Sequence, residues 1–127
     1  MKHILIVDDD SAIQQIFEEF LQGEGFSTAL AADGFEAILQ LKEQTPDLII
    51  TDIIMDGMDG LALIREVRKK EFHVPVIAIS GGRCELSVDF EPRAEQTGAD
   101  EFLEKPIRLA DLLEAIQTLL DKNPPSD

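Results

Sequence analysis

Short apolar runs alternate with segments of helical periodicity along most of the chain. The apolar runs predict five strands, at residues 3–7, 26–31, 47–51, 76–79 and 101–103. Between them, apolar residues recur at i, i+3, i+4 and i+7, which is typical of helices that bury one face. This alternation predicts an α/β fold: a doubly wound five-stranded parallel sheet with five helices on its two faces.

The apolar positions also predict which helix faces pack inward. The first helix begins at Ser11, with Ser11 or Asp10 as its cap, and ends at Gly23 and Gly25. The second follows a turn at Asp33-Gly34. The fourth helix occupies the later part of residues 83–97. The residues expected to face the core are Ile13, Ile16, Phe17, Phe20 and Leu21, then Phe35, Ile38 and Leu39, then Leu61, Ile64 and Val67, and finally Leu109, Leu112, Leu113, Ile116, Leu119 and Leu120. The residues of the third helix expected to face water are Arg65, Arg68, Lys69 and Lys70.

Length and charge limit the functional classes. The 127 residues predict one domain over residues 1–122, with residues 123–127 as a tail or the start of a linker. A net charge of −15 argues against direct binding to nucleic acid or to an anionic membrane, since both need basic patches. The chain start lacks the pattern of a signal peptide, and the single cysteine, Cys84, fits a reducing compartment. We therefore expect a cytoplasmic protein.

Polar side chains follow four of the predicted strands. They are Asp8 and Asp9, Asp52, Ser80, and Lys105. Taken alone, an acid or a serine after a strand is usually a turn residue, and a lone lysine is usually a solvated one. Because carboxyl ends of parallel strands meet at one edge of the sheet, these residues are expected to converge. Clustered carboxylates favour a hard cation such as Mg²⁺, and a carboxylate beside a cation and a lysine can accept a phosphoryl group.

At these motifs the chain resembles the receiver domain of two-component response regulators. The motifs are Ile4-Leu5-Ile6-Val7-Asp8-Asp9, Asp52 followed by Met55-x-Gly57-Met58-Asp59-Gly60, Ile79-Ser80-Gly81, Gly98-Ala99-Asp100 and Lys105-Pro106. The resemblance implies a flavodoxin-like fold with strand order 2-1-3-4-5. It also implies a regulator that acts through its own phosphorylation and dephosphorylation, and is not otherwise an enzyme.

The resemblance assigns roles to individual residues. It makes Asp52 the phosphoacceptor, and it places Mg²⁺ on Asp8, Asp9, Asp52 and the backbone carbonyl of Ile54. It makes Lys105 the cationic clamp. It further implies that Ser80 and Phe102 form the conformational switch. The implied partners are a histidine kinase or histidine phosphotransfer protein, and a downstream protein that binds the fourth helix, fifth strand and fifth helix.

We expect a stand-alone regulator that signals through protein–protein contacts, and three alternatives remain open. The first is a receiver from a longer protein in which Pro124-Pro125 begins a linker to an effector. A small Mg²⁺-dependent phosphatase with an aspartate nucleophile is a rival, although such enzymes carry a second acid where this chain has Ile54. A structural flavodoxin-like binding module leaves the convergence at four strand ends unexplained. The sequence departs from the receiver pattern at Asp56, at Gly81-Gly82, and in a long segment from Ser80 to Gly98.

Overall fold

A computed structural model describes residues 2–53, 60–70, 73–80, 99–104 and 106–122. Its elements are β1 (His3–Val7), α1 (Ser11–Gly23), β2 (Ser27–Ala31), α2 (Gly34–Glu43), β3 (Leu48–Asp52), α3 (Gly60–Lys69), β4 (Val76–Ser80), β5 (Glu101–Glu104) and α5 (Leu109–Lys122). The predicted strands are confirmed to within one residue at each end. The predicted fourth helix lies outside the described residues.

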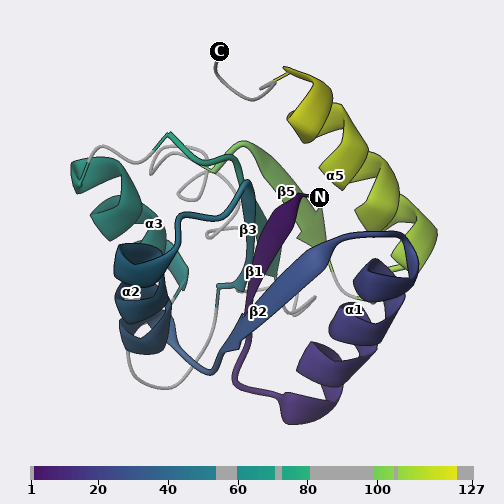
Figure 1. The fold of residues 1–127 in the computed structure, drawn as a ribbon, viewed down its shortest axis with the longest axis horizontal. Coiled ribbons are helices and arrows are strands. Elements are labelled where there is room, and N and C mark those ends of the chain that lie inside the picture. The colour runs from purple at the N-terminus through teal and green to yellow at the C-terminus, as the bar shows by residue number, and fades with distance from the viewer. Residues whose placement is uncertain (1, 54–59, 71–72, 81–98, 105, 123–127) are drawn as a thin grey trace.

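The five strands form one parallel sheet in the order β2-β1-β3-β4-β5, as predicted. Figure 1 shows α1 and α5 on one face of this sheet and α2 and α3 on the other. Because successive side chains of a strand point to opposite faces, β1 contributes to two cores. Ile4 and Ile6 pack with α1 and α5, whereas Leu5 and Val7 pack with α2 and α3. The described part of the chain contains no helix long and apolar enough to cross a membrane.

The start of α1 follows from its first polar residues. The side chain of Asp10 accepts hydrogen bonds from the backbone N–H groups of Ala12 and Ile13, at 2.9 and 3.4 Å. Asp10 is therefore the N-cap, and the alternative cap, Ser11, is the first helical residue. After the helix, Gly25 has a φ of +97°, a conformation that favours glycine, and its N–H reaches the carbonyl of Gln22 at 3.1 Å.

The predicted buried face of α2 is wrong at two of its three positions, since only Ile38 packs against the core. Phe35 and Leu39 are 60% and 61% exposed, and the helix instead buries Gly34, Ala37 and Leu41. Gly34, Ala37 and Leu41 also follow a helical spacing. Because glycine and alanine have small side chains, the sequence pattern did not mark this face as apolar. Ala37 and Leu41 on this face belong to the core that α2 and α3 form with the sheet.

Three further predictions need correction. Ile16 in α1 is 49% exposed, although Phe17 and Leu21 beside it are buried as expected. Asp33 does not simply form a turn: it is the N-cap of α2, and its side chain accepts a hydrogen bond from the N–H of Glu36 at 2.9 Å. Arg68 does not point freely to water, because its guanidinium donates to the carbonyl of Val74 and to the Asp100 carboxylate, each at 2.8 Å.

The outer edge of the sheet on one side is β2. Its Leu30 carbonyl accepts a hydrogen bond from the side-chain amide of Gln40 in α2. The α2 helix is thus tied to the edge strand by a side chain that also occupies one of the strand's outward hydrogen-bonding groups.

Candidate functional site: an acidic cluster at the carboxyl ends of β1 and β3

Three aspartates meet at the carboxyl ends of the two central strands. Asp8 directly follows β1, Asp9 is next to it, and Asp52 is the last residue of β3. The register pairs Val7 with Thr51, which brings the residues that follow side by side. One carboxylate oxygen from each of Asp8, Asp9 and Asp52 lies within 4.8 Å of the others. The predicted convergence of these acids is confirmed.

Two of the three acids in the cluster are buried, and the third is exposed to solvent. Asp8 is 2% exposed and Asp52 is 5% exposed, whereas Asp9 is exposed. A cation or a reactant could therefore reach the cluster beside Asp9, while the other two acids stay fixed in the protein.

The backbone around Asp8 is held by hydrogen bonds to its neighbours. The Asp8 N–H donates to the carbonyl of Ala31 at the end of β2, at 3.1 Å. The Asp8 carboxylate accepts a hydrogen bond from the N–H of Asp10 at 2.9 Å. Because the Asp10 carboxylate caps α1, it serves the helix start, as the sequence indicated. The turn from β1 into α1 therefore fixes the first acid before any ligand is present.

Gln14 is a site residue that sequence reasoning missed. Its side-chain nitrogen donates to two backbone carbonyls, that of Asp8 at 2.7 Å and that of Ala31 at 2.9 Å. The available signal was its position: Gln14 lies three residues before Phe17 and seven before Leu21, so it is a polar residue on the buried face of an amphipathic helix. Such a residue needs hydrogen-bond partners, and the strand ends supply them.

Asp52 is fixed by the continuation of β3. The fully buried Thr51 donates its hydroxyl to the carbonyl of Asp52 at 3.0 Å. The N–H of the next residue, Ile53, donates to the carbonyl of Ile79 in β4 at 2.9 Å, and the Ile53 side chain is buried. The peptide unit that follows Asp52 is thereby held at both its carbonyl and its N–H, which fixes the backbone from which the Asp52 carboxylate projects.

The other predicted site residues are placed only in part. The backbone of Ser80 ends β4, the strand beside β3, and is paired in register with Glu104. Phe102 lies in β5, where its half-buried ring packs against the core under α2 and α3. Ile54 and Lys105 lie outside the described residues, so their predicted roles stay predictions.

The donor set of the cluster fits a magnesium ion. All three side chains offer carboxylate oxygens, which are the ligands that hard divalent cations prefer. Three carboxylates from two short segments leave room for water or a phosphoryl oxygen in an octahedral shell. Gathering negative charge in a mostly buried place is costly, and a bound cation offsets that cost.

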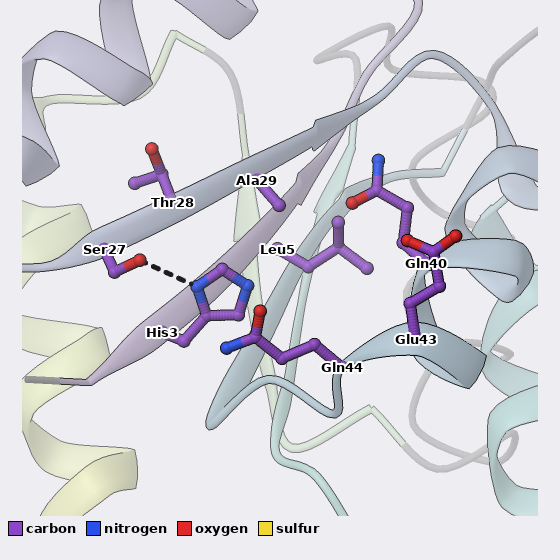
Figure 2. A pocket seen from close by; sticks show the side chains of 8 residues that line it. All are labelled: His3, Leu5, Ser27, Thr28, Ala29, Gln40, Glu43 and Gln44. Carbon is purple, nitrogen blue, oxygen red and sulfur yellow. Dashed lines mark hydrogen bonds between the residues drawn. The ribbon is translucent and has the colours of Figure 1, made fainter.

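A hollow lies away from the acidic cluster. Figure 2 shows it at the amino end of the sheet, where the side chains of His3 and Ser27 are joined by a 3.0 Å hydrogen bond and Gln40 and Glu43 extend from α2. Its volume is about 510 Å³. Because His3 begins β1 while Asp8 follows the end of that strand, this histidine lies at the opposite end from the acids. This histidine is therefore a residue of the strand and lies away from the candidate site.

Comparison with known proteins identifies relatives over nearly the whole chain. The response regulator receiver domain profile matches residues 4–117. The chain is 33% identical to the response regulator MprA of Mycobacterium avium over 98% of this chain and 53% of that protein. It is 38% identical to the transcriptional regulatory protein PrrA of Mycobacterium tuberculosis over 92% of this chain and 49% of that protein. The chain thus spans about half the length of these curated relatives.

Solved structures agree with the sequence comparison. A CheY-like receiver domain protein from Methanospirillum hungatei superposes with a TM-score of 0.89 at 31% identity, over 96% of this chain and 95% of that one. The receiver domain of NtrX from Brucella abortus gives a TM-score of 0.85 at 32% identity, over 93% and 98% of the two chains. The phosphatase alternative gains no support from any of these relatives.

Proposed function

Because the chain belongs to the response regulator receiver domain family, we propose that Asp52 accepts a phosphoryl group from a phosphohistidine, with Mg²⁺ held by Asp8, Asp9 and Asp52. The observation that carries this proposal is the meeting of the three carboxylates within 4.8 Å at the ends of β1 and β3. Among these acids, Asp52 alone ends the central strand β3, and the peptide unit that follows it is held by two hydrogen bonds.

The proposed reaction is a transfer from nitrogen to oxygen. A carboxylate oxygen of Asp52 attacks the phosphorus, and the O–P bond forms as the P–N bond breaks. The imidazole leaves with the electron pair of that bond and returns as a neutral ring after protonation. When bound, Mg²⁺ supplies positive charge beside the phosphoryl oxygens. The fixed backbone of Asp8 and Asp52 contributes by holding nucleophile and cation ligands in place, which removes entropy from the barrier.

The remaining roles rest on the resemblance. Lys105 would contact the phosphoryl group as a second cation, the backbone carbonyl of Ile54 would complete the metal shell, and Ser80 with Phe102 would couple phosphorylation to the surface. Such a switch acts by favouring one of two conformations. The backbone of Ser80 at the end of β4, beside β3, is compatible with this role.

Output would occur by protein contact at β5 and α5, together with the predicted fourth helix. A hollow of about 320 Å³ lies between β5 and α5, and three of its lining residues are Glu101, Asp111 and Glu114. An acidic hollow favours a downstream protein with basic side chains. The net charge of −15 supports output without direct contact to nucleic acid or membranes, and we place the protein in the cytoplasm with its kinase.

Two chain organisations remain compatible with this function. In the first, residues 1–122 are a stand-alone regulator that promotes only its own phosphorylation and dephosphorylation. In the second, residues 123–127 begin a linker to an effector domain, an organisation favoured by the greater length of MprA and PrrA. The length of the full reading frame distinguishes them.

The proposal is tested by phosphorylation with acetyl phosphate and Mg²⁺, followed by intact mass. We expect wild type to gain one phosphoryl group and Asp52→Asn to gain none while its circular dichroism stays native. The matched control is Asp10→Asn, because asparagine remains a good N-cap and this acid belongs to the same turn. Undiminished labelling of Asp52→Asn would refute the assignment. Steady turnover of p-nitrophenyl phosphate would instead support the phosphatase alternative.

A further inference from the structure

We propose that Gln14 is a positioning residue for the magnesium site: its amide fixes the Asp8 backbone and thereby presents the Asp8 carboxylate to the cation. This inference rests on the proposed function. Gln14 does not touch the predicted reacting atoms, and it belongs to none of the motifs that identified the family. Its contribution is to the geometry of a metal ligand.

One nitrogen makes both contacts. The Gln14 amide has two N–H groups, and they match two acceptors, the carbonyls of Asp8 at 2.7 Å and Ala31 at 2.9 Å. The Ala31 carbonyl also accepts the N–H of Asp8 at 3.1 Å. Gln14 therefore links the end of β1 to the end of β2 at the residue where the chain leaves the sheet.

These bonds hold Asp8 at three of its polar groups. Its N–H is bound by Ala31, its carbonyl by Gln14, and a carboxylate oxygen by the N–H of Asp10. The peptide unit after Asp8 consists of the Asp8 carbonyl and the Asp9 N–H, so its rotation would move both groups. Because Gln14 holds that carbonyl, it restrains the relative direction of two of the three acids in the cluster.

A neutral donor suits this position. A lysine or arginine would supply hydrogen bonds too, but it would add a positive charge at the turn that carries two of the three acids. An apolar residue would leave two carbonyls at the strand ends without this donor. The amide satisfies both carbonyls and adds no charge, so the cluster keeps its full attraction for a cation.

The expected change in Mg²⁺ affinity follows from other residues that orient metal ligands without touching the metal. Residues that orient metal ligands typically change metal affinity by 10- to 100-fold when removed, in order-of-magnitude terms. Gln14 acts on the backbone of the ligand and not on its carboxylate, so we expect the low end, about tenfold.

The test is isothermal titration of the unphosphorylated protein with MgCl₂, using Gln14→Met and the neighbouring Gln15→Met as matched variants. Methionine keeps the length and flexibility of glutamine but donates no hydrogen bond. Gln15 is exposed, and its amide donates to the carboxylate of Glu19 at 3.3 Å. We expect the Mg²⁺ dissociation constant to rise about tenfold in Gln14→Met and to stay within about twofold of wild type in Gln15→Met.

A second readout separates positioning from general stability. In phosphorylation by acetyl phosphate, Gln14→Met should raise the Mg²⁺ concentration for half-maximal rate, while the rate at saturating Mg²⁺ stays near that of wild type. If Gln14→Met does not fold, Gln14→Asn replaces it, since the shorter amide cannot reach both carbonyls, and the same shift is expected.

Wild-type affinity for Mg²⁺ in the folded Gln14 variant would overturn the inference, whatever its melting temperature. Failure of wild type itself to bind Mg²⁺ or to become phosphorylated would be a failure of the proposed function. The two failures are therefore distinguishable in one set of titrations.

Discussion

The two ends of the sheet use aspartate in opposite ways. At the amino end, the Asp100 carboxylate accepts hydrogen bonds from Arg68 at 2.8 Å and from the N–H of Val76 at 2.9 Å, and Asp47 accepts one from the N–H of His3 at 2.7 Å. At the carboxyl end, three carboxylates are gathered within 4.8 Å of one another. The amino end matches each acid with donors that join neighbouring elements, whereas the carboxyl end concentrates negative charge. Stability is built at one end, and the capacity to bind a cation at the other.

The largest expected effect is at the amino end. Asp100→Ala removes the acceptor shared by Arg68 and the buried N–H of Val76, and it should lower the free energy of unfolding by about 2–3 kcal/mol. The measurement is urea unfolding followed by circular dichroism. Asp111→Ala is the control, because its 3.3 Å pair with Arg108 is exposed and surface pairs contribute about 0–1 kcal/mol. Equal losses of unfolding free energy in Asp100→Ala and Asp111→Ala would show that Asp100 contributes no more to stability than an exposed surface acid.

Magnesium should raise the melting temperature of the domain by binding at the carboxyl end of the sheet. At a free Mg²⁺ concentration ten times its dissociation constant, binding to the folded state adds about 1.4 kcal/mol, or a rise in melting temperature of roughly 5 °C for a domain of this size. We expect this rise in wild type and in Asp111→Ala, and its loss in Asp9→Ala, which removes one of the three acids. Thermal unfolding with and without MgCl₂ measures it. An unchanged rise in Asp9→Ala would place the ion elsewhere.

The smallest effect concerns charge alone. Without Mg²⁺, Asp9→Asn removes one of three clustered like charges and should raise the melting temperature by about 2–4 °C, the gain being limited because Asp9 is exposed and screened by solvent. Raising the salt concentration should shrink the gain. Asp111→Asn, at an exposed acid outside the cluster, should not raise it. A lower melting temperature in Asp9→Asn would mean that charge repulsion does not dominate this end of the sheet.

The sequence predicted those features that depend on strong local patterns. Strands β1, β3 and β4 are largely apolar runs, and β2 and β5 are shorter apolar stretches with polar residues at one or both ends. The strand limits and the convergence of Asp8, Asp9 and Asp52 followed from these patterns, and the strand order followed from the resemblance. The strand ends meet because the sheet is parallel, which leaves little room for another arrangement.

The errors concern choices that only packing decides. The spacing of Phe35 and Leu39 fits a buried helix face as well as that of Ala37 and Leu41 does, and only the packing of the folded helix selects between them. Arg68 looks like a surface cation until Asp100, far away in the chain, is brought beside it.

Gln14 was missed for a similar reason. Its two acceptors lie just after β1 and at the end of β2, and no short motif records such an arrangement. Both Arg68 and Gln14 thus depend on partners that the fold brings together from distant segments.

The bond from Gln40 to the Leu30 carbonyl has a consequence beyond the single molecule. An open edge strand is a template on which another chain can add a strand, and this is a route to aggregation. In β2, the Gln40 side chain already occupies one outward carbonyl at the edge. An added strand would have to displace that amide before it could pair with β2. A second copy of this chain would also be repelled, because each copy carries a net charge of −15. The edge is therefore protected against self-assembly by one glutamine and by the charge of the whole domain.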